Sequence, residues 1–192
     1  MSNFIILLNG ASSSGKSSIV KELQSLFVDE PLLNMGADRF MSMIPKDYQG
    51  FGKKAGCMWA WEKVQGDSGE IVTLKLGDLG EKFVLGVYRC IKMMYQDGFN
   101  VIVDDVWMEK ELLNKIFADI LSDCKVYFIG VNCDLQILQE REIARNNRVV
   151  GSTRGQHELV HQFCEYDFVV DTSQTSSRDC ALKIKEFIDA NL

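Results

Sequence analysis

The sequence has little that would suit a nucleic-acid or membrane protein. Its 192 residues carry 21 basic and 27 acidic side chains, which gives a net charge of −6. Binders of nucleic acid or anionic membranes usually present a basic face, so neither kind of partner is expected. No apolar run approaches the length that spans a bilayer, and no basic leader precedes the first apolar run. We therefore expect a cytoplasmic protein.

The six cysteines are widely scattered, and none forms a C-x-x-C pair. Without a secretory signal, a chain of this length does not need a disulfide framework, so we expect reduced thiols. The scatter also argues against a zinc site. A helix could bring His157 and His161 together on a metal, but no third ligand is evident, and we expect no metal there.

Apolar runs alternate with segments of helical spacing along most of the chain. Expected strands cover residues 3–9, 31–38, 100–106, 125–133 and 166–173. Expected helices cover residues 16–27, 77–98, 109–123, 134–148 and 175–192. This alternation predicts an α/β protein with a five-stranded, mostly parallel sheet. We find no internal repeat and no linker, so one domain over residues 1–192 is expected.

Two segments break the alternation. Residues 39–78 contain two β-like runs around GDSG, which predicts a small hairpin inserted on the substrate side. Residues 146–165 are polar and punctuated by glycine, which is typical of a mobile lid. Together with the end of the preceding helix, the lid would span residues 141–165.

The stretch from Gly10 to Ser17, GASSSGKS, satisfies the pattern G-x-x-x-x-G-K-[ST], with a strand before it and a helix after it. Small side chains let backbone N–H groups wrap phosphate oxygens, and the helix adds its positive end. Lys16 would bridge the β- and γ-phosphates, and the Ser17 hydroxyl would bind Mg²⁺. The alternative is a simple glycine-serine turn. The expected nucleotide-binding residues are Gly10, Ala11, Ser12, Ser13, Ser14, Gly15, Lys16, Ser17 and Ser18.

Three carboxylates follow apolar strands, where ligands of parallel sheets usually bind. Asp104 and Asp105 stand where a Walker-B carboxylate holds the Mg²⁺ shell, although either could instead cap the next helix. Which of the two faces the metal stays open. Asp38 ends the second expected strand and could accept the proton of a substrate hydroxyl, or it could simply form a turn after Gly36.

Arg141, Arg145 and Arg148 fall on one helical face and just past its end. Arginines on a closing lid can stabilise the charge of a transferred phosphoryl group. The alternative is a solvated face paired with Glu140 and Glu142.

The Gly10–Ser17 motif is the phosphate-binding loop (P-loop) of a large group of nucleotide-binding proteins. Within this group, a small kinase fits the features of the sequence best. No NKxD element of a GTPase is found, and motor ATPases are normally larger. In small kinases the loop after the last strand often lies by the adenine, which makes Thr172 a nucleotide-binding candidate.

On the expected hairpin, Trp59 and Trp61 alternate and share one face, where they could stack on an aromatic substrate or simply pack. The fold expected is a three-layer P-loop kinase fold with an inserted hairpin and a helical lid.

Five blocks of the sequence resemble, in order and spacing, the chloramphenicol phosphotransferase family. These are IILLNGASSSGKSSIV, MGADRF, VIVDDV, GVNCDLQILQEREIARNNRVVG and HQFCEYDFVVDTS. The resemblance covers most of the chain outside residues 39–78. It implies an O-phosphotransferase that uses ATP and Mg²⁺ and acts on a small hydroxylated molecule. It also implies Asp38 as general base and Arg141, Arg145 and Arg148 as lid residues.

Two other functions stay open at this stage. One is a kinase for a nucleotide, another metabolite or a sugar nucleotide, the last as in toxin-like kinases. The other is a nucleotide-binding regulator without enzymatic activity. The sequence leaves the acceptor and the oligomeric state undetermined.

Overall fold

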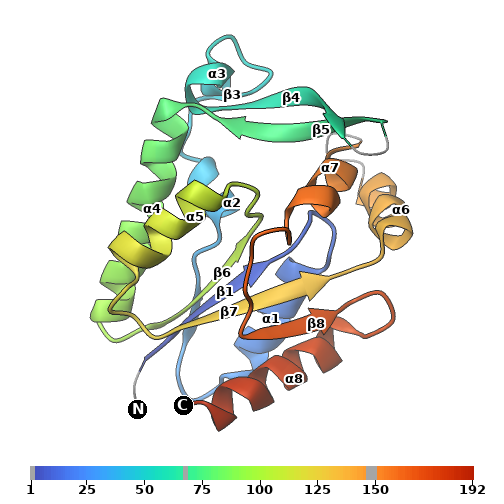
Figure 1. The fold of residues 1–192 in the computed structure, drawn as a ribbon. Helices are drawn as coiled ribbons and strands as arrows, with labels where there is room; N and C mark the ends of the chain where they lie inside the picture. Colours follow the sequence, from blue (N-terminus) through green and yellow to red (C-terminus); the bar gives the residue numbers. More distant parts are fainter. Residues whose placement is uncertain (1–2, 67–68, 146–150) are drawn as a thin grey trace.

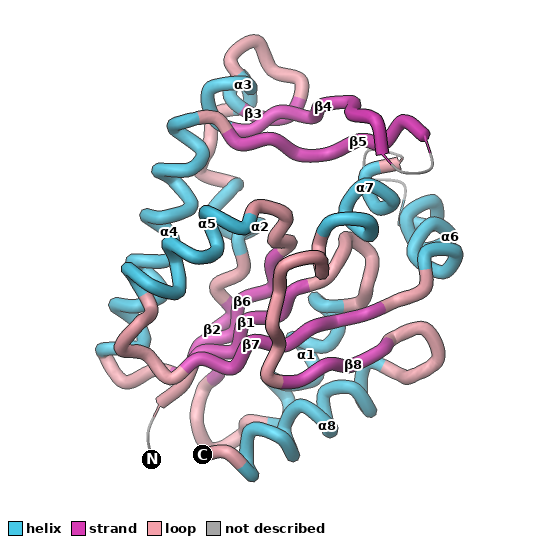
Figure 2. The backbone as a smooth tube through the Cα atoms, in the orientation of Figure 1, coloured by secondary structure: helices cyan, strands magenta, loops and turns pink. Residues whose placement is uncertain are grey.

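A computed structural model of the chain describes residues 3–66, 69–145 and 151–192, and a five-stranded sheet lies at its centre (Figures 1 and 2). The strands stand in the order β2-β6-β1-β7-β8, and every neighbouring pair is parallel. Their bounds are β1 Ile5–Asn9, β2 Leu32–Asn34, β6 Asn100–Asp105, β7 Val126–Asn132 and β8 Phe168–Asp171. The predicted α/β fold with five parallel strands is confirmed.

Helices cover both faces of this sheet and make three layers. Successive side chains of a strand point to opposite faces. Ile6 and Leu8 accordingly pack with the helices α1 and α8, whereas Ile5 and Leu7 pack with α4 and α5. The bounds are α1 Lys16–Leu26, α4 Asp78–Gln96, α5 Lys110–Lys115 and α8 Ser177–Ala190, and a π-helical turn, η2 Ile116–Ile120, follows α5. No helix in the described ranges combines the length and apolar character needed to cross a membrane.

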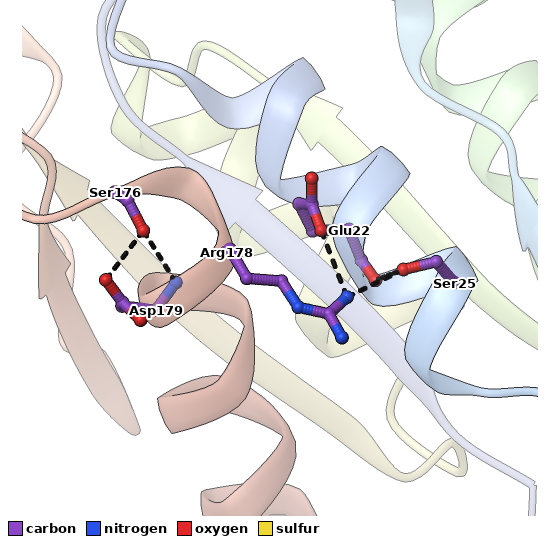
Figure 3. Close-up of polar contacts among 5 residues, drawn as sticks. All are labelled: Glu22, Ser25, Ser176, Arg178 and Asp179. Atoms are coloured by element: carbon purple, nitrogen blue, oxygen red, sulfur yellow. Dashed lines mark hydrogen bonds and ion pairs between the residues drawn. The ribbon is translucent and has the colours of Figure 1, made fainter.

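Polar contacts hold α8 against α1 on one side of the sheet (Figure 3). Arg178 donates from Nη1 to Glu22 Oε2 at 3.1 Å and to Ser25 Oγ at 2.9 Å. The Ser176 side chain caps α8 by accepting the backbone N–H of Asp179 at 3.1 Å. These contacts fix the loop that precedes α8 relative to α1, the helix that begins at the GASSSGKS loop.

The insertion after β2 forms a second, smaller sheet beyond the ends of the central strands (Figure 1). The strands β4 Trp59–Gly66 and β5 Gly69–Leu76 pair antiparallel, which confirms the predicted hairpin. A two-residue strand, β3 Gln49–Gly50, adds a parallel pairing that was not predicted, because so short a run carries no periodicity. The insertion also contains α2 Ala37–Met41, η1 Lys46–Tyr48 and α3 Ala55–Met58.

The second strand is shorter than predicted. It ends at Asn34 instead of residue 38, because the Asn34 side chain accepts the Gly36 N–H at 3.1 Å and turns the chain. Asp38 therefore does not end a strand. It lies in the first turn of α2.

The segment expected as a mobile, helical lid contains a packed helix. Residues Leu135–Arg145 form α6 and Ser152–Leu159 form α7, which lies between α6 and the hairpin (Figure 1). Four residues of α7 are buried: Ser152, Thr153, Gly155 and Gln156. The predictions for residues 146–150, Arg148 among them, fall outside the described residues.

Candidate active site

The GASSSGKS loop has the close packing that its small residues predict. A Cβ at Gly10 would come within 2.5 Å of the Val131 carbonyl oxygen, so no side chain fits there. Gly15 takes a left-handed φ of 93° and precedes the first residue of α1. Ser13 has a φ of 65°, the one positive φ among non-glycine residues in the described part of the chain. The loop therefore wraps tightly over the N-terminal end of a helix, which suits an anion.

Lys16 points back over this loop. Its Nζ donates to the carbonyl oxygens of Gly10 at 2.6 Å and Ala11 at 2.8 Å, and the residue is buried. The charged group thus lies inside the curve of the loop, where it can move onto phosphate oxygens.

The two aspartates at the end of β6 have different partners. Ser17 Oγ donates to Asp104 Oδ2 at 2.7 Å, which brings together two hard oxygen ligands of the kind Mg²⁺ prefers. Asp105 instead accepts the Tyr88 hydroxyl at 2.5 Å. Burial, with the nearby Asp105 carboxylate, raises the pKa of Tyr88 well above its usual value. Neither aspartate caps the next helix, because the N-cap of α5 is Glu109.

Gly36 brings the Asp38 turn against the end of β6. A Cβ at Gly36 would overlap the Oδ1 of Asp104, so only glycine allows this approach. Asp38 is exposed at the start of α2 and lines the same cavity as Asp104. The structure therefore places the expected base and the expected magnesium ligand in the lining of one cavity, with the base on α2 rather than at a strand end.

A cavity of about 460 Å³ opens between the loop, Asp38 and the hairpin. Polar and charged residues of its lining include Lys16, Ser17, Asp38, Asp104 and Asp105. Much of the remaining lining is apolar and aromatic and includes Met41, Met58, Trp59, Trp61, Leu74, Leu76, Phe83, Val84, Val87 and Trp107. Trp59 and Trp61 pack edge to face with ring centroids 5.8 Å apart, and both line this cavity. The wall suits a ligand with a polar end and an apolar body.

A second cavity of about 460 Å³ also borders the loop. Its lining residues are Ser13, Gly15, Ser18, Arg141, Ala144, Arg145, Thr172, Thr175, Ser176 and Ser177. Arg141 is fixed at its rim, because Nη2 donates to the Thr172 carbonyl oxygen at 2.9 Å and Nη1 to its Oγ1 at 3.3 Å. Thr172 in turn donates from Oγ1 to the Ser14 carbonyl oxygen at 2.7 Å.

Arg145 lines both cavities from the end of α6. Ser13 and Gly15 of the loop are also shared by both linings. Of the three expected lid arginines, Arg141 thus lies by the second cavity and Arg145 at the junction of the two. Arg148 falls outside the described residues.

Two buried residues near the site have roles that the sequence did not predict: Gln156 was not singled out, and Glu142 was considered only as part of a solvated face. Gln156 of α7 accepts the Ser12 N–H on Oε1 at 2.6 Å. Glu142 of α6 accepts the hydroxyls of Ser152 and Thr153 and backbone N–H groups at the start of α7. Burial alone would raise the pKa of Glu142, but these hydrogen bonds outweigh it and lower the pKa. The sequence did carry a signal that Glu142 is buried. It lies four residues after Leu138, on the same face of α6, and Leu138 is buried.

The residues from His157 to His161, HELVH, also match the H-E-x-x-H spacing of zinc sites, because Glu158 follows the first histidine. Glu158 pairs with Arg154 at 3.5 Å, and His161 Nδ1 lies 2.7 Å from the Tyr166 hydroxyl. Within the described ranges, no three His, Cys, Asp or Glu side chains gather as a metal site. Burial, with His157 and Lys16 nearby, lowers the pKa of His161.

The sheet order, the phosphate-type loop and the paired Ser17 and Asp104 define a P-loop kinase fold, and solved structures agree. APS kinase of Mycobacterium tuberculosis, solved with AMPPNP and APS, has a TM-score of 0.65 at 14% identity, covering 97% of this chain and 98% of that one. Shikimate kinase of Acinetobacter baumannii, solved with shikimate, has a TM-score of 0.55 at 12% identity, covering 98% and 94%. At such identities the likeness concerns the fold.

The family is established by sequence. Residues 3–189 match the family model described as chloramphenicol phosphotransferase-like protein. A protein of M. tuberculosis H37Rv, named provisionally as the O-phosphotransferase Rv2636, is 30% identical over 188 residues, which cover 97% of this chain and 82% of the relative. The same match is found for its counterpart MT2714 in strain CDC 1551. The chain belongs to the chloramphenicol phosphotransferase-like family, and the expectation of an enzyme of the phosphotransferase class is confirmed.

Proposed function

We propose that this enzyme transfers the γ-phosphate of ATP to a hydroxyl of a small, neutral and largely apolar molecule. The observation that carries the proposal is the meeting of two cavities at Ser13, Gly15 and Arg145. ATP would enter the second cavity and the acceptor the first, so the transferred group would cross at the loop.

The donor side would use the chain's own polar groups. Loop N–H groups and Lys16 would hold the β- and γ-phosphates, and Thr172 and Arg141 would lie by the nucleoside. Ser17 and Asp104 would hold Mg²⁺, whose charge lowers the repulsion between phosphate oxygens when it is bound. Arg145, with Arg148 as a further candidate, would neutralise charge on the transferred group.

On the acceptor side, Asp38 would orient the hydroxyl and accept its proton as the oxygen attacks the phosphorus atom. The hairpin tryptophans would pack on the acceptor body and exclude water. In this proposal the chain is one domain, residues 39–78 are its substrate-side insertion and residues 141–165 contribute to its lid. Its use of ATP and its six free cysteines favour the cytoplasm.

Charge in the acceptor cavity supports a neutral substrate. Among the described lining residues, Lys16 and Arg145 are the only basic ones, and both also contact or face the phosphate loop. An acceptor that carries its own phosphate or carboxylate would need further cations, and Asp38, Asp104 and Asp105 would repel it. Chloramphenicol, an uncharged aromatic alcohol, meets these requirements.

The test is a panel of acceptors incubated with ATP labelled at the γ-phosphate. We expect label to pass to chloramphenicol or to another uncharged aromatic alcohol, and to do so only with Mg²⁺ present. Preferred transfer to a nucleotide, a sugar nucleotide or a carboxylated acceptor would contradict the neutral-substrate proposal. Nucleotide binding without transfer to any acceptor would favour a regulator instead.

A further inference from the structure

Ser13 holds a strained conformation in a turn that the Ser14 N–H closes by donating to the Ala11 carbonyl oxygen at 3.2 Å. It has a left-handed φ of 65°, which costs free energy in a residue with a Cβ and persists only where the surroundings impose it. Ser13 also lines both cavities, so its backbone lies where donor and acceptor would meet. Whatever holds Ser13 in place also sets the shape of the phosphate loop.

Two buried side chains from distant elements hold the residues on either side of Ser13. Before it, Gln156 Oε1 accepts the Ser12 N–H at 2.6 Å. After it, Thr172 Oγ1 donates to the Ser14 carbonyl oxygen at 2.7 Å. Gln156 is 6% exposed and Thr172 is 3% exposed, so water competes little for either bond.

Gln156 is itself held firmly, because α7 is fixed at several points. A Cβ at the preceding residue, Gly155, would lie 2.5 Å from the Val72 carbonyl oxygen, so α7 packs directly on β5 of the hairpin. The start of α7 is bonded to Glu142, and at its end the Val160 carbonyl oxygen accepts Asn9 Nδ2 at 2.9 Å. α7 therefore joins the acceptor-side hairpin to the phosphate loop.

We propose that Gln156 is a positioning residue that, opposite Thr172, holds Ser13 in the left-handed conformation required to bind the triphosphate. Gln156 does so from the acceptor side and Thr172 from the nucleotide side. The inference rests on the proposed function only in treating the loop as a nucleotide site, and nucleotide binding can be measured without any acceptor.

The experiment replaces Gln156 by methionine, which keeps the side-chain length and removes the oxygen. Binding of AMP-PNP with Mg²⁺, measured by calorimetry, should weaken about tenfold, because the loop loses one of the bonds that hold its strained conformation. The variant Ser13→Gly removes the Cβ penalty, so the double variant Ser13→Gly/Gln156→Met should recover most of the lost affinity. Gln162→Met is the control, since Gln162 is exposed and its side chain bonds only the Glu158 carbonyl oxygen among the described residues.

The rescue separates positioning from a general packing effect. If Gln156 served only to pack α7, changing Ser13 would not restore affinity, and the proposal would be overturned. Unchanged affinity in Gln156→Met would overturn it as well. Failure of the phosphotransfer proposal has a different signature, in which the parent binds AMP-PNP and the rescue occurs but no acceptor is phosphorylated.

Discussion

Ser17 Oγ donates a hydrogen bond of 2.7 Å to Asp104 Oδ2, which joins the last residue of the phosphate loop to a carboxylate at the end of β6. This contact distinguishes Asp104 from its neighbour, because Asp105 is bonded to the buried Tyr88. If the pair holds Mg²⁺, the two aspartates should respond very differently to substitution.

Asp104→Asn should raise the Mg²⁺ concentration required for phosphotransfer and lower kcat, because a neutral amide binds a divalent cation weakly. Asp105→Asn should leave the Mg²⁺ requirement near that of the parent and mainly reduce stability, because an amide oxygen accepts the Tyr88 hydroxyl more weakly than the carboxylate does. Tyr88→Phe should also reduce stability, because it removes this buried hydrogen bond. Magnesium titrations of activity and thermal unfolding of the three variants check this. An equal change of Mg²⁺ requirement in Asp104→Asn and Asp105→Asn would be inconsistent with the assignment.

Gly36→Ala should reproduce the loss of activity of Asp104→Asn, although it changes no polar group. The added Cβ would overlap Asp104 Oδ1, so the carboxylate or the Asp38 turn must move. The matched control is Gly86→Ala in α4, where nothing lies within 4 Å of the added Cβ. That change should raise stability by about 0.5–1 kcal/mol, as usual for glycine to alanine within a helix. Full activity of Gly36→Ala would show that the close contact of Gly36 with Asp104 is not required for phosphotransfer.

Trp61→Ala should raise the KM of the acceptor and leave the KM of ATP nearly unchanged, since Trp61 lines only the first cavity. An aromatic contact contributes about 0.5–1.5 kcal/mol beyond buried area, so the acceptor KM should rise about 3- to 10-fold. The control is Phe51→Ala in the same insertion, because Phe51 is 77% exposed and lines neither cavity. A larger effect on the KM of ATP would place the acceptor elsewhere.

Glu142→Gln should change how stability depends on pH. The pKa of Glu142 is lower in the folded protein, so the unfolded chain takes up the proton first as the pH falls. The carboxylate therefore contributes its full stability above the ordinary glutamate pKa of about 4.3, and this contribution declines as pH falls toward the folded pKa.

Urea unfolding over a pH series measures this effect. The parent should lose more stability on acidification than Glu142→Gln does, and the variant should also be less stable at neutral pH. The control is Glu140→Gln, whose side chain is exposed and accepts a single bond from Gln136. Identical pH profiles for the parent and Glu142→Gln would contradict the role of Glu142 at the start of α7.

The central sheet and the phosphate loop could be predicted because their signals are local. Each strand is a short apolar run, and the motif from Gly10 to Ser17 by itself predicts a phosphate-binding loop between a strand and a helix. The position of Asp38 could not be predicted, because the strand is ended by the Asn34 side chain and by the packing of Gly36 on Asp104. That packing joins segments far apart in sequence.

Two further features depended on tertiary contacts. Asp104 and Asp105 alternate across β6, but the sequence does not state which face of the strand the phosphate loop occupies. The lid was expected to be mobile, but the helix α7 within it is packed through a polar face. Its burial comes from hydrogen bonds to Glu142 and Ser12 and from the close contact of Gly155, so hydrophobic periodicity gave no sign of it.

Asp38→Asn gives the most direct test of the whole account, with binding and transfer measured on the same protein. Calorimetry with AMP-PNP and Mg²⁺ should find nucleotide affinity close to the parent's, because the proposed role of Asp38 is to contact the acceptor hydroxyl and not the phosphates or Mg²⁺. Transfer of labelled γ-phosphate to the preferred alcohol should fall by about 10²–10⁴-fold, the usual contribution of a general base. Unreduced transfer, or loss of nucleotide binding in parallel with transfer, would contradict the assignment of Asp38 as the general base.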